Sequence, residues 1–243
     1  MRVEAQAAPG IFSDRAARLA GLLYLGTIVG GVFAEVVARG SLIVGADAGA
    51  TATAILANEA LFRAGLVGDV AMLACYVGVT TLLYGMFSPA HQRVSQMAAA
   101  FSLTGIAVLA SATLLLLAPL RLLAASPYLA AIGQDQREAA ALLALKIHGD
   151  GYDVSLIFFG IYCLMLGWLI WRSGSLPRII GALMGVAGAC YLMNSVAGLA
   201  APGFARILSP YVMLPTLIGE GALAIWLIVF GAGRRSRRSV LPR

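Results

Sequence analysis

The chain has 243 residues, of which 60% are hydrophobic and 12% are charged, and its mean hydropathy is +0.90. Because soluble domains carry about 25% charged residues, this chain has too few polar groups to cover a globular surface, which excludes an ordinary soluble domain. Its net charge of +6 does not indicate nucleic-acid binding, since the arginines cluster at the ends of apolar stretches, as they do in membrane proteins.

Six apolar stretches are long enough to cross a bilayer, since a helix needs roughly 20 residues to span the hydrocarbon core. We therefore predict an all-α fold, an integral membrane bundle of six transmembrane helices that forms a single domain over residues 1–243. We expect residues 1–15 and the basic tail 233–243 to lie outside the membrane. The predicted spans are residues 16–38, 60–87, 95–124, 153–172, 178–200 and 210–232.

The connection between the first two spans, residues 39–59, is long enough for a short helix. Asp47 and Thr51 both have side chains suited to cap a helix N-terminus, so we expect this helix to begin near one of them. Three other connections are short, and they comprise residues 88–93, 172–177 and 201–209.

The connection between the third and fourth spans, residues 125–152, contains a second helical segment at 136–147. Gly149 and Gly151 follow this segment, and glycine weakens a helix because of its conformational freedom. We therefore predict that the segment ends before the fourth span begins.

The basic residues predict the orientation, because Lys and Arg accumulate on the cytoplasmic side of membrane proteins. Of the 17 basic residues, 11 fall on the side that holds both termini: Arg2, Arg15, Arg18, Arg93, Arg172, Arg178, Arg234, Arg235, Arg237, Arg238 and Arg243. We therefore predict that the N- and C-termini are cytoplasmic, and we interpret the tail 233–243 as a basic stop after the last helix.

Acidic residues lie inside three of the predicted spans, at Glu35, Asp69 and Glu220. A carboxylate at the centre of a membrane helix costs about 2.5–3.5 kcal/mol on insertion scales, so such residues usually face a protein interior or a wet cavity. Polar residues recur on the same helix faces at spacings of three, four and seven. We therefore predict a ligand pocket that opens toward the outside and is lined by Glu35, Arg63, Asp69, Arg121, Asn194 and Glu220.

Other roles for these carboxylates stay open. Glu35 with Arg39 and Glu59 with Arg63 have the spacing of i,i+4 salt bridges. Asp69 and Glu220 also suit a structural network with Arg63, Arg121 or a tyrosine, or a role in carrying protons.

The segment 146–153 is the densest polar cluster of the chain and contains His148, Asp150 and Asp153. His148 with Asp150 or Asp153 is a candidate catalytic pair of base and orienting carboxylate. The same residues, with Glu220 or Glu35, are a weaker candidate for metal ligands. The interpretation that we favour is an interfacial loop in which Asp153 caps the fourth span. We assign no metal and no cofactor, and the sequence contains no GxSxG, HExxH or Walker motif.

Two blocks carry a family resemblance. Residues 18–63 begin with RLAGLLYLGTIVGGVFAEVVARG, and residues 158–195 contain SGSLPRIIG at the turn between the fourth and fifth spans. Together these blocks resemble a bacterial family of multi-pass membrane proteins, domain-of-unknown-function family 4386, from about residue 15 to residue 232. The resemblance implies a multi-pass protein of the bacterial inner membrane, and it brings no activity and no catalytic residues.

Three functional hypotheses remain. The first is a membrane protein whose pocket binds or transports a small polar or amphiphilic molecule, such as a lipid headgroup. The second is an intramembrane hydrolase or transferase that acts on lipid through His148 with Asp150 or Asp153. The third is a structural or regulatory subunit that grips another membrane protein. The expected partners are the lipid bilayer, a small-molecule or lipid ligand and a membrane protein, and not a nucleic acid.

Overall fold

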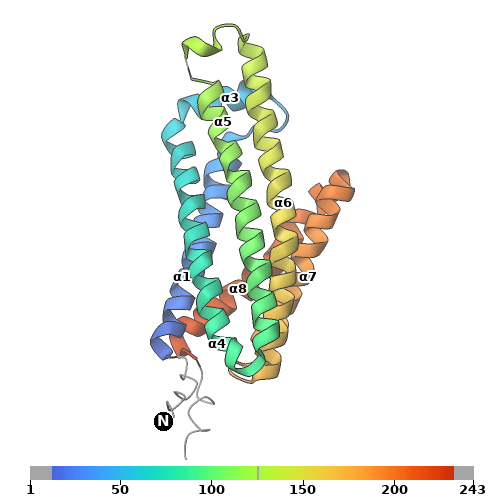
Figure 1. The fold of residues 1–243 in the computed structure, drawn as a ribbon. Helices are drawn as coiled ribbons and strands as arrows, with labels where there is room; N and C mark the ends of the chain where they lie inside the picture. Colours follow the sequence, from blue (N-terminus) through green and yellow to red (C-terminus); the bar gives the residue numbers. More distant parts are fainter. Residues whose placement is uncertain (1–12, 125, 233–243) are drawn as a thin grey trace, which may run out of the picture.

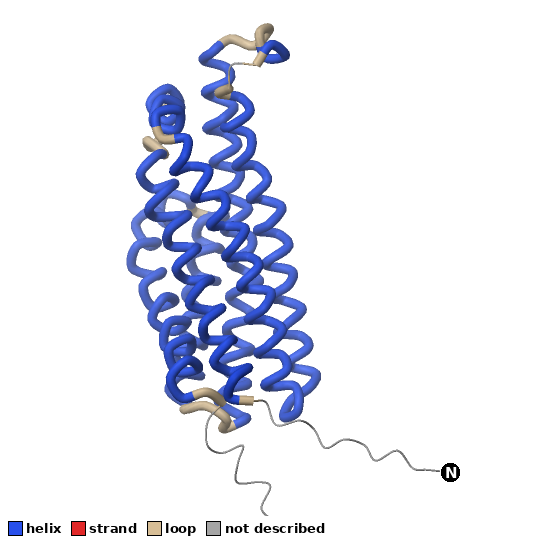
Figure 2. The backbone as a smooth tube through the Cα atoms, turned by 90° about the vertical axis from the view of Figure 1, so that its left-hand side faces the viewer, coloured by secondary structure: helices blue, strands red, loops and turns tan. Residues whose placement is uncertain are grey.

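The computed structural model describes residues 13–124 and 126–232, and these residues are almost all helical and form no strand. The predicted all-α class is therefore confirmed. Five helical segments of the described chain are long and apolar enough to cross a membrane: Asp14–Leu42, Glu59–Leu122, Gln134–Ser173, Arg178–Ala200 and Tyr211–Phe230. They form an elongated bundle of helices that run roughly side by side (Figures 1 and 2).

The described residues form α-helices together with short π-helical and 3₁₀-helical pieces. Three short irregular pieces interrupt the α-helices: the π-helix η1 (Phe33–Arg39) and the 3₁₀-helices η2 (Leu114–Leu116) and η3 (Pro127–Leu129). The α-helices are α1 (Asp14–Val32), α2 (Gly40–Leu42), α3 (Ala48–Ala57), α4 (Glu59–Thr113), α5 (Leu117–Leu122), α6 (Gln134–Ser173), α7 (Arg178–Ala200) and α8 (Pro202–Phe230). The predictions for residues 1–12 and for the tail 233–243 lie outside the described residues.

Helix α4 folds back on itself within its 55 residues. A straight helix of that length would extend about 80 Å at 1.5 Å per residue, but Figure 1 shows one arm descending and a second arm returning beside it. The break is at His91, whose φ of −147° and ψ of 70° are not helical, and Pro89 precedes it. The connection predicted at 88–93 is therefore reduced to a sharp kink.

Helix α6 is continuous over 40 residues, so the prediction that Gly149 and Gly151 end a helix is wrong. The reason is packing, because a Cβ atom at Gly151 would lie 2.6 Å from the Ala112 Cβ in the second arm of α4. Glycine here permits close helix contact, which offsets its cost of about 1 kcal/mol inside a helix. The predicted cap at Asp153 is also wrong, since this residue lies well inside α6.

Helix α3 begins after Asp47, whose carboxylate accepts a hydrogen bond of 2.8 Å from the Ala50 N–H, so the predicted cap is confirmed. Helix α8 begins at Pro202, and the connection predicted at 201–209 is mostly helical. Proline suits this first position because it has no N–H to leave unpaired.

Glycine pairs bring α6 and α7 together. A Cβ atom on Gly167 would lie 2.6 Å from the Gly181 carbonyl oxygen, and one on Gly160 would lie 3.0 Å from the Gly188 oxygen. Close backbone packing of this kind is a main source of helix association in lipid, where burial of apolar surface gives little.

The beginning of α1 and the end of α8 meet at one end of the bundle. A Cβ atom on Gly231 would lie 2.9 Å from Oδ1 of Asp14. The α3 and α5 helices, η3 and the first turns of α6 lie at the opposite end (Figure 1).

Candidate functional site

Two adjoining cavities lie inside the bundle. The polar cavity, of about 560 Å³, is bounded mainly by η1, α6 and α7, and the tyrosine cavity, of about 360 Å³, extends between α1, α4, α6 and α8. Both volumes are in the range of small-molecule sites. Four residues line both cavities, which therefore meet: Glu35, Tyr152, Leu156 and Met213.

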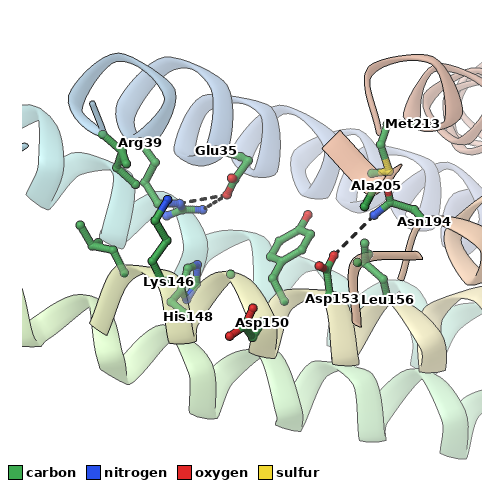
Figure 3. A pocket seen from close by; sticks show the side chains of 15 residues that line it. Glu35, Arg39, Lys146, His148, Asp150, Asp153, Leu156, Asn194, Ala205 and Met213 are labelled. Carbon is green, nitrogen blue, oxygen red and sulfur yellow. Dashed lines mark hydrogen bonds and ion pairs between the residues drawn. The ribbon is translucent and has the colours of Figure 1, made fainter. Parts of the chain in front are cut away.

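Arg39 is the buried centre of charge at the polar cavity. Its guanidinium donates to both carboxylate oxygens of Asp69, at 3.1 Å from Nη2 to Oδ1 and by a shorter bond from Nη1 to Oδ2. Its Nε and Nη2 also donate to Oε2 of Glu35, at 2.9 and 2.8 Å (Figure 3). The guanidinium thus neutralises Asp69, which is 3% exposed, while Glu35 keeps an exposed face toward the cavity.

The π-helix η1 explains how Arg39 reaches this position. The Gly40 N–H donates to the Glu35 carbonyl, five residues back, so each turn holds an extra residue compared with an α-helix. That extra residue rotates the following side chains about the helix axis. Arg39 is consequently buried against α4, and π-helical turns of this kind occur frequently at functional sites.

His148 is buried on α6 and does not pair with either neighbouring carboxylate. Its Nδ1 lies 3.2 Å from the Ala112 carbonyl oxygen, and since a carbonyl only accepts, Nδ1 carries the proton of this hydrogen bond. The Nε2 atom is buried and has no hydrogen-bond partner among the described residues. The candidate pairs with Asp150 or Asp153 are therefore not formed, and a backbone group orients the imidazole.

Asp153 instead connects α6 to α7. Its Oδ1 accepts a hydrogen bond of 3.4 Å from Nδ2 of Asn194, whose own Oδ1 is buried without a partner (Figure 3). Lys146 and Asp150 are exposed where α6 borders the polar cavity. Within residues 13–124 and 126–232, no group of three or more His, Cys, Asp or Glu side chains is arranged to hold a metal ion.

Glu220 is buried and lines the tyrosine cavity. Its side chain is on α8 and is 7% exposed, and its Oε1 accepts a long hydrogen bond of 3.8 Å from the Cys163 thiol. The phenols of Tyr24 and Tyr191 lie close to the carboxylate. Within the described part of the chain, no Lys or Arg forms an ion pair with it.

Aromatic rings surround this end of the cavity. Tyr76 stacks on Phe159 with ring centres 4.7 Å apart, and its ring lies 6.0 Å from that of Tyr24 and 6.2 Å from that of Tyr162. The hydroxyl groups of all three tyrosines are buried and make no hydrogen bond of good geometry with the described residues. Of these three residues Tyr76 lines the tyrosine cavity, which therefore contains a polar atom that the described residues leave unsatisfied, and such an atom calls for an explanation.

One wall of the tyrosine cavity reaches the surface of the bundle. It contains exposed apolar side chains from α1 and η1 on one side and from α8 on the other: Val32, Val36, Leu214 and Leu217. The tyrosine cavity therefore opens on an apolar part of the outer surface of the bundle.

The structure brings most of the predicted site residues together. Glu35, His148, Asp150, Asp153 and Asn194 line the polar cavity, Glu220 lines the tyrosine cavity, and Asp69 lies behind Arg39. Arg63 and Arg121 are exposed and line neither cavity. The predicted i,i+4 salt bridges are confirmed, at 2.8 Å for Glu35–Arg39 and 2.6 Å for Glu59–Arg63.

The sequence did not predict the pair of Arg39 with Asp69, nor that Tyr24, Tyr76, Tyr162 and Tyr191 form a ring of tyrosines around Glu220. Arg39 was expected only as a partner of Glu35, although its position at the end of a span beside an acidic residue was a usable signal. The tyrosines come from α1, α4, α6 and α7, so only the tertiary fold gathers them around Glu220.

The comparisons with known proteins show the family to which the chain belongs. The sequence pattern of the family described as "Domain of unknown function (DUF4386)" matches residues 19–231, so the chain belongs to that family. It is also similar to an uncharacterized protein of Archaeoglobus fulgidus, with 35% identity over 79 residues, which cover 32% of this chain and 45% of the relative. No solved structure matches the chain.

Proposed function

We propose that this member of the family is a multi-pass membrane protein that binds a small amphiphilic molecule in its two joined cavities. The observation that carries the proposal is Glu220, a buried carboxylate without a basic partner among the described residues, which lines the cavity together with Tyr76, whose hydroxyl is buried and also unpaired in that part of the chain. A polar headgroup would satisfy these atoms, and an apolar chain would extend through the opening between α1 and α8.

The proposed topology has six crossings with both termini in the cytoplasm. The segment Glu59–Leu122 is 64 residues long and contains the kink at His91, so its two arms count as two crossings. An even number of crossings fits the contact between the beginning of α1 and the end of α8. Arg93, Arg172 and Arg178 lie at that same end, which favours its cytoplasmic location in a bacterial inner membrane.

In this orientation the polar cavity faces the outside. Below the tyrosine cavity the core is filled with fully buried apolar side chains such as Leu83, Phe87, Leu166 and Leu169. This packing is mainly apolar, although it includes the buried Thr80, Ser95 and Ser102. The proposal is therefore binding of a ligand from the membrane or the outside, and transport would require this packing to open.

A lipid-acting enzyme is the second candidate, and one observation favours it. The Nε2 atom of His148, a residue that lines the polar cavity, is an acceptor without a partner once Nδ1 carries the proton. The absence of a paired carboxylate among the described neighbours of His148 is the reason that we place binding first.

Native mass spectrometry of the gently solubilised protein, followed by extraction and identification of bound molecules, tests the proposal. We expect one small amphiphile per chain in the wild type and a loss of occupancy in Glu220→Gln. The matched control is Glu59→Gln, which removes an equal charge from an exposed salt bridge outside both cavities. Equal occupancy in all three proteins, or an empty wild type, would contradict it.

A further inference from the structure

We infer that the ligand of the tyrosine cavity is an organic cation, an amphiphile whose ammonium group lies against Glu220 and whose alkyl chain leaves between α1 and α8. This inference rests on the proposed function and names the chemical class of its ligand.

The charged residues that line the tyrosine cavity are all acidic. Of the residues that line it, the charged ones are Glu35 and Glu220, and no Lys or Arg is among them. Arg39 does not change this balance, because its single positive charge is shared between Glu35 and Asp69. An anionic headgroup would be repelled here, whereas a cation would supply the missing counter-charge in a medium of low dielectric constant, where such attraction is strong.

The aromatic rings favour a cation for an independent reason. The faces of phenol and phenyl rings carry partial negative charge and attract ammonium groups, especially where water is excluded. Four aromatic residues line the same cavity as Glu220: Tyr76, Tyr152, Phe159 and Tyr191. Recognition of quaternary ammonium groups by cages of aromatic rings is a well-established use of this attraction.

No basic residue of the described chain pairs with Glu220. Its polar neighbours are the weak Cys163 thiol donor at 3.8 Å and the phenols of Tyr191 and Tyr24, and the Tyr24 hydroxyl makes no hydrogen bond of good geometry with the described residues. The Tyr76 hydroxyl, on a side chain that is 6% exposed and lines the cavity, is likewise without a partner. A protonated amine has N–H donors for the carboxylate and for phenol oxygens, so it can satisfy several of these atoms at once.

The remaining wall suits an alkyl chain. The residues that lead from the ring of tyrosines to the surface are apolar, with Ile28 and Val32 on α1 and Leu214 and Leu217 on α8. An alkyl chain along this wall keeps its methylene groups out of water and reaches the lipid. Burial of each methylene group stabilises the bound state by about 0.8 kcal/mol.

The test is a competition binding assay with chain-matched probes on protein solubilised in the uncharged detergent dodecyl maltoside. Radiolabelled octylammonium is the tracer, and octyltrimethylammonium, octanol and octyl sulfate are the competitors. We expect saturable binding of octylammonium at one site per chain, displacement by octyltrimethylammonium, and displacement by octanol or octyl sulfate only at concentrations at least about tenfold higher.

Two variants locate the site. Glu220→Gln should weaken octylammonium binding about tenfold or more, while Glu59→Gln, with the same change of charge, should bind as the wild type does. Tyr76→Phe keeps the ring and removes the hydroxyl, so it should weaken octylammonium several-fold and leave octyltrimethylammonium, which has no N–H donor, unchanged.

The outcomes separate this inference from the proposed function. Displacement by octanol at the same concentration as octylammonium, or preference for octyl sulfate, would overturn the cation inference and leave amphiphile binding standing. Saturable binding of none of the four probes would contradict both. The competition series on the wild type decides the ligand class even if Glu220→Gln does not fold.

Discussion

The guanidinium of Arg39 donates hydrogen bonds to both carboxylate oxygens of Asp69, a residue 30 positions later in the chain. These bonds hold η1 against α4. Both residues are less than 5% exposed, so this is a buried ion pair joined by two hydrogen bonds at the boundary of the polar cavity. Its effect is to hold Glu35, the third member of the group, at the junction of the two cavities.

Removing one partner of this pair should destabilise the bundle. Asp69→Asn leaves the buried Arg39 with Glu35 as its remaining carboxylate, and we expect the free energy of unfolding to fall by about 3 kcal/mol. Glu59→Gln breaks the exposed pair with Arg63 and should cost less than about 1 kcal/mol. Thermal unfolding of both variants in detergent checks this, and equal losses would show that the Arg39–Asp69 pair has no special role.

The contact between α6 and α7 should depend on particular glycines. A Cβ atom on Gly181 would lie 2.8 Å from the Gly167 carbonyl oxygen, whereas one on Gly185, a turn later on α7, would meet no atom within 4 Å. Gly181→Ala should therefore lower the midpoint of thermal unfolding because the backbones must separate. Gly185→Ala should leave it unchanged or raise it, since alanine favours a helix by about 1 kcal/mol. The opposite ranking would refute the packing account.

The proposed topology makes a prediction about labelling from the two sides of the membrane. A cysteine introduced at Ala131, between η3 and α6, should react with a membrane-impermeant maleimide in intact cells. One introduced at Gln92, beside the kink of α4, should react only after the cells are opened. Both positions are exposed, so access and not burial decides the result. Labelling of Gln92→Cys in intact cells would contradict the proposed orientation, because it would place the kink of α4 outside the cytoplasm.

The opening between α1 and α8 should control how quickly the ligand enters. Leu217→Trp enlarges an exposed side chain that lines the tyrosine cavity, so it should slow the association of octylammonium severalfold. Ile225→Trp makes the same kind of change at an exposed α8 position outside the cavity and should have no effect. Stopped-flow or filter-binding kinetics measure both rates. If the two variants associate equally fast, the ligand does not enter by this route.

The sequence predicted the helical class and much of the local structure, because apolar length and caps are local properties. The apolar stretches, the cap at Asp47 and the salt bridge of Glu35 with Arg39 depend on residues that are near one another in the chain. It failed where tertiary packing decides the outcome. Gly151 looked like a helix end because its contact with Ala112 on another helix cannot be read from the spacing along α6.

The sequence predicted which carboxylates belong to the candidate site, but it did not predict how these residues and their partners are arranged. Glu35 and Glu220 were identified because acidic residues inside apolar spans are costly. The π-helical turn that rotates Arg39 toward Asp69 has no clear sequence signal, and this pairing replaced the expected partners Arg63 and Arg121. The tyrosines around Glu220 belong to four helices, so periodicity on any single helix could not gather them.

The measurement that tests the central claim most directly is an experimental density map of the protein purified in lipid nanodiscs with a bound antibody fragment. Our account predicts an elongated density that begins beside the Glu220 carboxylate, passes the ring of Tyr76 and leaves between α1 and α8. A map in which protein side chains fill this space, and in which Glu220 is paired with a basic residue of the chain, would contradict the account.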